Sequence, residues 1–461
     1  MAEPSARLAA FAATLDIADI PQAALEAASR SLLDIAGVAI RGREHAVAAS
    51  GLAGARALSS GSAQAVVWGT GERLDIAAAV LANGIAAHVD DFDDTHGNGI
   101  VHGSAVIAPV VVALGAAQAC SGADMLAALV AGWEVAARVG LASRGTFHER
   151  GFHTTSIAGV FGATAAAARL LRLAPAQATH ALGLAGSQAS GINEYLTNGS
   201  SSKALHCGWA AHAGIVAARL AQGGMTGPAT VFEGRRGVLA GYGHPERCDP
   251  AQLDAELGSR WEVRQVSIKP YPCCHWVHAF FDCAVRLRER GIGAGDIRSI
   301  TCVVDPLEVP MVCEPRDDKL APATPYVAKF SLPFVVATGV LDGKVGHATF
   351  ESANLGRSDL RALAQRVHYR VAEPGETPFP RTYPGRLTAE LHDGRSIEER
   401  LDTNLGHPDN PLSFAQVQAK FRDNAGRALG EAGVRRVIEA VQDLPRMSAQ
   451  AFSATLAAPA G

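Results

Sequence analysis

The stretch from Ala82 to Pro109 places the residues best suited to chemistry in an apolar setting. It contains four aspartates and three histidines, namely Asp90, Asp91, Asp93, Asp94, His88, His96 and His102. Its flanks consist almost entirely of Ala, Val, Ile and Gly. Charged groups in such a setting must be paired, bound to a metal or used in catalysis, because burying an isolated charge is costly. We therefore predict that this stretch forms one wall of an active site.

The aspartates of this stretch admit three interpretations. They could belong to a polar loop that caps the next helix. They could orient the histidines, because a carboxylate bonded to one ring nitrogen fixes the tautomer and raises the basicity of the other. Alternatively, Asp90, Asp91 and Asp94 have the spacing of a DDxxD magnesium site in an isoprenoid synthase, although no second motif of the NDxxSxxxE type accompanies them.

Two further segments place polar groups where helices are expected to begin. Residues 151–156, GFHTTS, lead into a Gly/Ala-rich helix, and a helix N-terminus with hydroxyls nearby suits an anion; a capping segment with a surface histidine is the alternative. Residues 198–206 form a small-residue loop with Ser202 and Lys203, and Lys203 shares a helical face with His206. This loop favours carboxylate or phosphate binding, or is a flexible loop with a solvated lysine.

A fourth segment, residues 269–278 with sequence KPYPCCHWVH, lies where the helical sequence pattern gives way to a strand-like pattern. Pro270 and Pro272 stiffen it. Cys273 and Cys274 could suggest a nucleophile or a metal site, but adjacent cysteines rarely bind one metal in structural motifs. We predict packing cysteines at a domain hinge and no metal. Together the four segments suit proton transfer on a small carboxylated substrate.

Hydrophobic periodicity predicts a mainly helical chain up to about residue 268. The expected helices begin near residues 21, 75, 121, 160 and 204, and Ser121 and Asp124 mark one start. Period-two alternation then predicts strands within 261–272, 297–306, 368–373 and 385–402, with a hairpin turn at Asp393-Gly394. Helix returns after Ser413. The predicted fold class is mostly α with an α+β insertion.

Composition excludes several classes of partner. The chain has 461 residues, of which 48% are hydrophobic and 19% charged, which is typical of a globular protein. A net charge of −4 without a basic stripe argues against nucleic acid or membrane partners. The N-terminal segment lacks the features of a signal peptide, so we expect a cytoplasmic protein. The eight cysteines form no CxxC pair, which predicts reduced and mostly buried thiols.

Taken in order, these segments resemble the MmgE/PrpD family, whose members include 2-methylcitrate dehydratase, cis-aconitate decarboxylase and iminodisuccinate epimerase. The resemblance rests on NGIAAHVDDFDDTH, VHGSAVIAP, GFHTTSIAGVFGATAAAARLL, SSKALHCGWAAHAG, GPATVFEG, KPYPCCHWVHAFFD and FSLPFVVATGVLDGKV. It implies a large all-helical domain formed by residues 1–268 and 403–461, with a smaller α+β lid domain at 269–402. It also implies a homodimer without organic cofactor or metal.

The resemblance carries the decarboxylase site pattern onto Asp91, Thr95, His102, His153, Lys203 and Lys269. Two positions depart from that pattern: Cys274 replaces a histidine, and Gly103 replaces the proline that usually follows the residue corresponding to His102. Both departures weaken a decarboxylase assignment. The preferred hypothesis is therefore a hydro-lyase on a small di- or tricarboxylic acid, similar to 2-methylcitrate dehydratase.

In this hypothesis Lys203 and Lys269 bind substrate carboxylates. His102 and His153 form the acid–base pair, and Asp91 supports a histidine or the developing cation. The remaining predicted substrate-binding residues are Thr95, Ser202 and His278. A decarboxylase or epimerase of the same family, a magnesium-dependent isoprenoid synthase and a non-catalytic carboxylate-binding paralogue are the alternatives.

Overall fold

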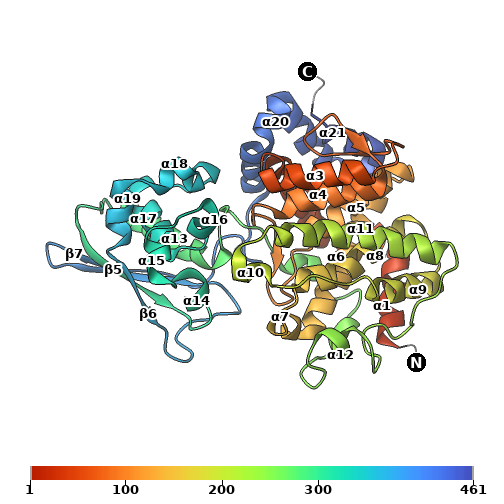
Figure 1. Cartoon of the computed structure of the whole chain (residues 1–461), viewed down its shortest axis with the longest axis horizontal. Coiled ribbons are helices and arrows are strands. Elements are labelled where there is room, and N and C mark those ends of the chain that lie inside the picture. The colour runs from red at the N-terminus through yellow and green to blue at the C-terminus, as the bar shows by residue number, and fades with distance from the viewer. Residues whose placement is uncertain (1–2, 459–461) are drawn as a thin grey trace. The chain divides into compact units, whose positions relative to one another are not determined.

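The computed structural model describes residues 3–458, and these form two compact units (Figure 1). Among the described residues, the helical unit comprises residues 3–268 and 413–458, and the second unit comprises residues 269–412. The sequence placed the second boundary at 402/403. Figure 1 shows the blue C-terminal helices lying among the red and orange N-terminal helices, because the chain returns to the helical unit after the insertion.

The helical unit consists of helices and short paired strands. Its helices are α1 (Pro4–Thr14), α2 (Gln22–Gly42), α3 (Ala46–Leu58), α4 (Ile76–His88), α5 (Ser104–Ala117), α6 (Gly122–Ser143), α7 (Thr146–Glu149), α8 (Thr154–Leu170), α9 (Pro175–Gly186), α10 (Tyr195–Asn198), α11 (Ser202–Gln222), α12 (Val238–Tyr242), α20 (Phe414–Gln442) and α21 (Ala449–Thr455). Its strand pairs are β1 (Ala65–Val66) with β2 (Arg73–Leu74), and β3 (Thr95–His96) with β4 (Val266–Ser267), both antiparallel.

The core of the helical unit is built from helices that are apolar on every side. Every residue of α5 from Ser104 to Ala116 is buried. Such helices belong in the interior, because they have no face to present to water. Within the described part of the chain, α6 is long and apolar enough to cross a membrane by length and composition, but 94% of its apolar window is buried inside the protein. We therefore interpret α6 as a core helix.

Several predicted helix ends are confirmed, and one is corrected. Ser121 and Asp124 form a capping box at the start of α6. Ser413 caps α20 in the same way, and α20 breaks at Gly430, where φ is 64°. The helix predicted from Val160 begins earlier, at Thr154. Its N-cap, His153, makes no side-chain capping bond.

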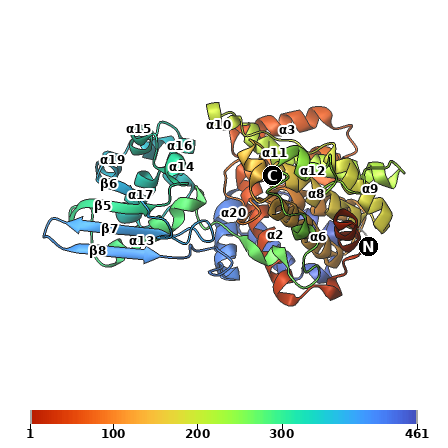
Figure 2. The same ribbon diagram turned by 90° about the horizontal axis from the view of Figure 1, so that it is seen from below.

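The second unit contains a four-stranded sheet in the order β6-β5-β7-β8, against which α13 and α17 pack (Figure 2). Its strands are β5 (Ile297–Val304), β6 (Val367–Val371), β7 (Gly385–Leu391) and β8 (Ser396–Leu401). Its helices are α13 (His278–Glu289), α14 (Val309–Val312), α15 (Arg316–Leu320), α16 (Pro325–Lys329), α17 (Leu332–Asp342), α18 (Ser352–Leu355) and α19 (Ser358–Ala364). The β5–β6 pair is parallel, and β7 is antiparallel to both β5 and β8.

The predicted fold class, mostly α with a smaller α+β part, is confirmed. The hairpin turn at Asp393-Gly394 is also confirmed, and Gly394 there takes a φ of +88°. The strand predicted within 261–272 is largely wrong. Residues Glu262–Gln265 form a 3-10 turn, and only Val266–Ser267 pair as a strand. All eight cysteines are free, and all except the half-buried Cys248 are buried.

Candidate active site

The loop between α4 and α5 sends its aspartates to different partners. Oδ2 of Asp93 lies 2.7 Å from Nδ1 of His88, with both side chains fully buried. Oδ1 of Asp91 lies 2.7 Å from Nζ of Lys203 in the first turn of α11. Asp91 takes a φ of +54°, which Asp tolerates better than most residues. The aspartates therefore support a histidine and a lysine separately.

Asp94 has a third environment that argues against a DDxxD magnesium site. Its carboxyl group is hydrogen-bonded to the backbone N–H and the hydroxyl of Ser104, the first residue of α5. Burial raises the pKa of Asp94 to about 8, so it is mostly protonated at neutral pH. A diphosphate-bound magnesium ion requires carboxylates that are ionised and converge on the metal. Asp91 and Asp94 have separate partners and different environments, which does not fit that role.

The hydrogen bonds of His102 define its tautomer. Nδ1 of His102 lies 2.9 Å from the carbonyl oxygen of Asp94, which can only accept a hydrogen bond. Nδ1 therefore carries the proton, and Nε2 is unprotonated in the neutral ring. The Thr95 hydroxyl lies 3.1 Å from the same Nδ1, and Oδ2 of Asp93 lies 3.7 Å away. Thr95 thus holds the ring in place, and Asp93 supplies a nearby negative charge.

His153 and His206 form a second histidine system. Their Nδ1 atoms lie 3.0 Å apart, so one of them donates a hydrogen bond and the other accepts it. Burial, with smaller contributions from His88 and Lys203, lowers the pKa of His206 to about 4 and lowers that of His153 well below its usual value. Both rings are therefore neutral at pH 7.

The histidine rings of the two systems gather into one cluster, which we call the imidazole cluster: His88, His102, His153 and His206. Ring centroids are 5.2 Å apart for His88 and His102, 5.5 Å for His88 and His153, and 6.4 Å for His102 and His153. His206 lies 5.1 Å from His153, and Tyr195 meets His206 edge-on at 5.9 Å. Proton donors and acceptors from separate parts of the chain thus converge.

Close contact between α4 and α11 brings His88 and Lys203 to the same place. A Cβ atom built on Gly84 of α4 would lie 2.7 Å from Cα of Gly208 on α11, so neither position accepts a side chain without movement. These two helices carry His88 and Lys203 respectively. The small residues of the sequence therefore have a direct role in assembling the site.

Lys420 anchors the aspartate loop from the C-terminal part of the chain. Its ammonium group donates to the carbonyl oxygen of Phe92 at 3.0 Å and lies 3.7 Å from the centre of that ring. It also lies 2.7 Å from Oδ1 of the buried Asp34 on α2. Return of the chain to the helical unit thus supplies a cation that fixes the loop next to Asp91 and Asp93.

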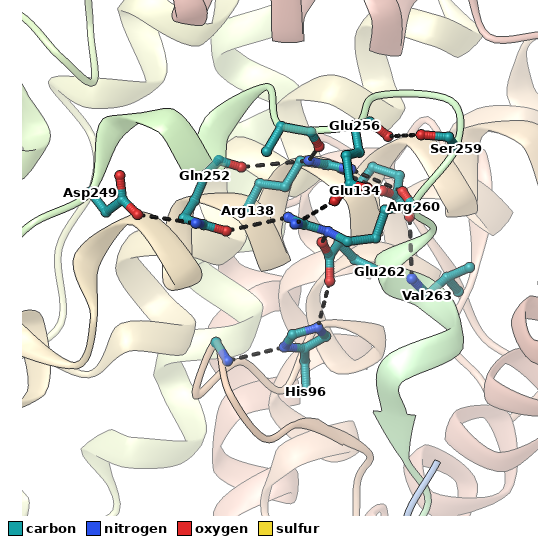
Figure 3. Close-up of polar contacts among 12 residues, drawn as sticks. His96, Glu134, Arg138, Asp249, Gln252, Glu256, Ser259, Arg260, Glu262 and Val263 are labelled. Carbon is teal, nitrogen blue, oxygen red and sulfur yellow. Dashed lines mark hydrogen bonds and ion pairs between the residues drawn. The ribbon is translucent and has the colours of Figure 1, made fainter. Parts of the chain in front are cut away.

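A buried polar network holds the other end of the loop (Figure 3). His96 accepts the N–H of Gly99 at Nδ1, so its Nε2 carries a proton and donates to Glu262 at 3.1 Å. Arg260 donates to the same carboxylate at 2.6 Å, and the pKa of Glu262 falls to about 2 because these hydrogen bonds and charges outweigh its burial. Thr95 of β3 pairs with Ser267 of β4, so its backbone is held by this strand pair while its hydroxyl contacts His102.

One group of potential metal ligands occurs among residues 3–458: His88, Asp93 and Cys207, with ligand atoms within 4.8 Å of one another. His88 and Asp93 are already hydrogen-bonded to each other, and burial raises the pKa of the Cys207 thiol well above its usual value. A thiol must lose its proton to bind a metal. The set is therefore best described as a hydrogen-bonded pair beside a neutral thiol.

The structure brings most of the predicted site residues together in the helical unit: Asp91, Thr95, His102, His153 and Lys203. Ser202 is exposed at the start of α11, where its hydroxyl lies 3.2 Å from that of Ser200. Lys269 and His278 belong to the second unit, where both are buried, and Nε2 of His278 donates to the carbonyl oxygen of Cys273. Substrate binding by these two residues stays a prediction.

Sequence reasoning did not select four members of the site: His88, Asp93, His206 and Tyr195. His88 and Asp93 lie in the stretch that was singled out, and His206 shares a face of α11 with Lys203, so a signal existed for these three. Tyr195 had no such signal, because its place beside His153 and His206 follows from the position of the short helix α10.

The helical unit therefore contains a buried acid–base site with neutral imidazoles beside a lysine–aspartate pair. Such a site defines a protein that can transfer protons on an anionic small molecule. The chain belongs to the MmgE/PrpD family, since residues 6–251 match the MmgE/PrpD N-terminal domain and residues 271–445 match the C-terminal domain. The predicted family resemblance is confirmed.

Curated relatives of the chain are enzymes. It is 30% identical to cis-aconitate decarboxylase of Homo sapiens over 399 residues, which is 84% of this chain and 80% of that protein. Identity to cis-aconitate decarboxylase of Mus musculus is 30% over 402 residues, 84% and 79% of the two chains. For the Aspergillus terreus (strain NIH 2624 / FGSC A1156) enzyme of that name, identity is 26% over 404 residues, which is 83% of this chain and 81% of that protein. These names match the decarboxylase alternative rather than the preferred dehydratase.

Proposed function

We propose that the protein is a lyase that acts on a small di- or tricarboxylic acid by histidine-mediated proton transfer, and that cis-aconitate decarboxylation is its first candidate reaction. The names of the relatives support the reaction. The chemistry rests on one observation above all: the rings of His102 and His153 lie 6.4 Å apart in a buried cluster, beside the Lys203–Asp91 pair.

The proposal gives each residue a separate task. Lys203 binds a substrate carboxylate, because a charge-assisted hydrogen bond supplies both affinity and orientation. Loss of CO₂ breaks a carbon–carbon bond and leaves its electron pair on the remaining carbon skeleton. A histidine of the imidazole cluster then donates the proton that completes the product. Thr95 and Asp93 keep His102 in position for such a transfer.

Dehydration of a hydroxy acid such as 2-methylcitrate is the second candidate. Dehydration is favoured by the presence of two histidines with different partners. His102 lies beside Asp93 and Asp94, whereas His153 is hydrogen-bonded to His206. Dehydration needs a base at carbon and an acid at the leaving hydroxyl, and two differently supported imidazoles suit those roles. We further propose that the enzyme is a cytoplasmic homodimer that needs no organic cofactor.

A substrate panel tests the proposal. Purified protein treated with EDTA is incubated with cis-aconitate, citrate, 2-methylcitrate and iminodisuccinate, and products are identified by mass spectrometry. Release of CO₂ from cis-aconitate supports the first candidate, and a new double bond from 2-methylcitrate supports the second. Loss of chirality without either change identifies an epimerase. Binding of these acids without turnover would instead indicate a non-catalytic paralogue and refute the proposal.

A further inference from the structure

The contact between His153 and His206 joins two sides of the site. The His206 ring lines a cavity of about 480 Å³ in the helical unit, together with Tyr195 and Glu194. The cavity opens to solvent, since Ile192 and Trp209 on its wall are 57% and 41% exposed. His153 is 5% exposed, and its ring lies against those of His206 and His88. His206, itself 6% exposed, therefore touches both the cavity and His153.

The direction of the hydrogen bond between the two rings decides which nitrogen of His153 carries its proton. If His153 donates from Nδ1, its Nε2 is unprotonated, and His206 carries its own proton at Nε2. In the opposite direction His153 accepts at Nδ1 and carries its own proton at Nε2, where it cannot act as a base. The first direction alone gives Nε2 of His153 the form of a base.

Building on the proposed lyase function, we propose that His206 is a positioning residue that accepts the Nδ1 proton of His153 and so makes His153 the base, while His102 beside Asp93 is the acid. The two histidines differ in their support. Asp93 places a carboxylate 3.7 Å from Nδ1 of His102 and favours its protonated form. His153 has a neutral imidazole as its acceptor instead.

Burial agrees with this division of roles. Burial lowers the pKa of His153 well below its usual value, so the ring is unprotonated at neutral pH, as a base must be before it accepts a proton. The titratable groups that surround it come from several elements: His88 on α4, His102 in the loop before α5, Tyr195 on α10, and Lys203 and His206 on α11. Of these groups, His206 forms a side-chain hydrogen bond with His153.

Three substitutions at His206 separate positioning from packing. His206→Asn keeps an oxygen near the position of Nδ1 and should retain most of kcat. His206→Leu removes the acceptor and should lower kcat at least tenfold with little change in KM. His206→Asp places a carboxylate beside His153 and should move the acidic limb of the kcat–pH profile up by about 1 pH unit or more. Thermal unfolding confirms that each variant folds.

His212→Leu is the matched control, because His212 lies on the same helix and its Nδ1 bonds to the carbonyl oxygen of Ala77. It should leave kcat and the pH profile unchanged. An NMR titration of the His153 ring in the resting protein gives a readout independent of any substrate, and His206→Asp should raise its pKa. An unchanged titration would overturn the positioning role. A shifted titration with an unchanged kinetic profile would overturn His153 as the base. Absence of turnover by the parent protein would refute the proposed function alone.

Discussion

Replacing Lys203 with methionine separates the structural and catalytic roles of its ion pair with Asp91. The side chains of Lys203 and Asp91 are 19% and 10% exposed, and the two charges lie 2.7 Å apart. At an effective dielectric constant of about 20, such a pair attracts with about 6 kcal/mol before desolvation is counted. Breaking a buried pair typically costs about 3–5 kcal/mol, and the residual exposure here places our expectation at about 3 kcal/mol. Urea unfolding measures this loss.

The double variant Lys203→Met/Asp91→Asn tests the reasoning, because it removes both charges. It should recover at least half of the lost stability, since no carboxylate then remains in the pocket without its cation. Activity should stay at least a hundredfold below that of the parent, because the substrate carboxylate still lacks its ammonium partner. A double variant as unstable as the single one would show that the pair does not carry the stability. A double variant with parental kcat/KM would show that Lys203 does not bind substrate.

Three further outcomes follow from the site. His102→Ala should lose most activity while keeping the fold, as measured by turnover and circular dichroism; parental turnover would remove His102 from the mechanism. Asp94 has a pKa raised from 3.8 to about 8, so its carboxyl group opposes folding increasingly as pH rises from about 4 to 8. Asp94→Asn should therefore become increasingly stable relative to the parent across that window. In urea unfolding, the stability difference between variant and parent should be larger at pH 8 than at pH 5, and an equal difference at both pH values would contradict this. Gly84→Val should cost about 1–3 kcal/mol and most activity, because its side chain would press on Gly208 and separate α4 from α11; a parental melting temperature would contradict this.

Local patterns predicted much of the fold. The capping boxes at Ser121 and Ser413 and the turn at Gly394 were readable because a few neighbouring residues determine them. The strand predicted after Trp261 was mostly wrong for a tertiary reason. Glu262 is buried there and accepts a hydrogen bond from His96. This tertiary contact determines the local backbone conformation in place of the alternating pattern of the sequence.

The sequence indicated which segments contribute to the site but not which side chains contact each other there. Charged residues in apolar surroundings drew attention to Asp91, His102 and Lys203 without any structure. Their pairing depends on how closely α4 approaches α11, and that distance is set by the facing glycines. A contact between residues 112 positions apart, such as Asp91 with Lys203, has no local signature.

If Lys203 holds a substrate carboxylate and His153 is the base, as proposed, the electrostatics of the site give the substrate itself a part in catalysis. Burial, together with the nearby charge of Lys203, keeps His153 and His206 neutral at pH 7. A bound carboxylate offsets the charge of Lys203 and brings negative charge close to both rings, which raises their affinity for protons. His153 thus becomes a stronger base once the acid is bound than it is in the free enzyme. Because the bound carboxylate raises the proton affinity of the histidines, analogues that lack the carboxylate held by Lys203 should have a lower kcat as well as a lower affinity.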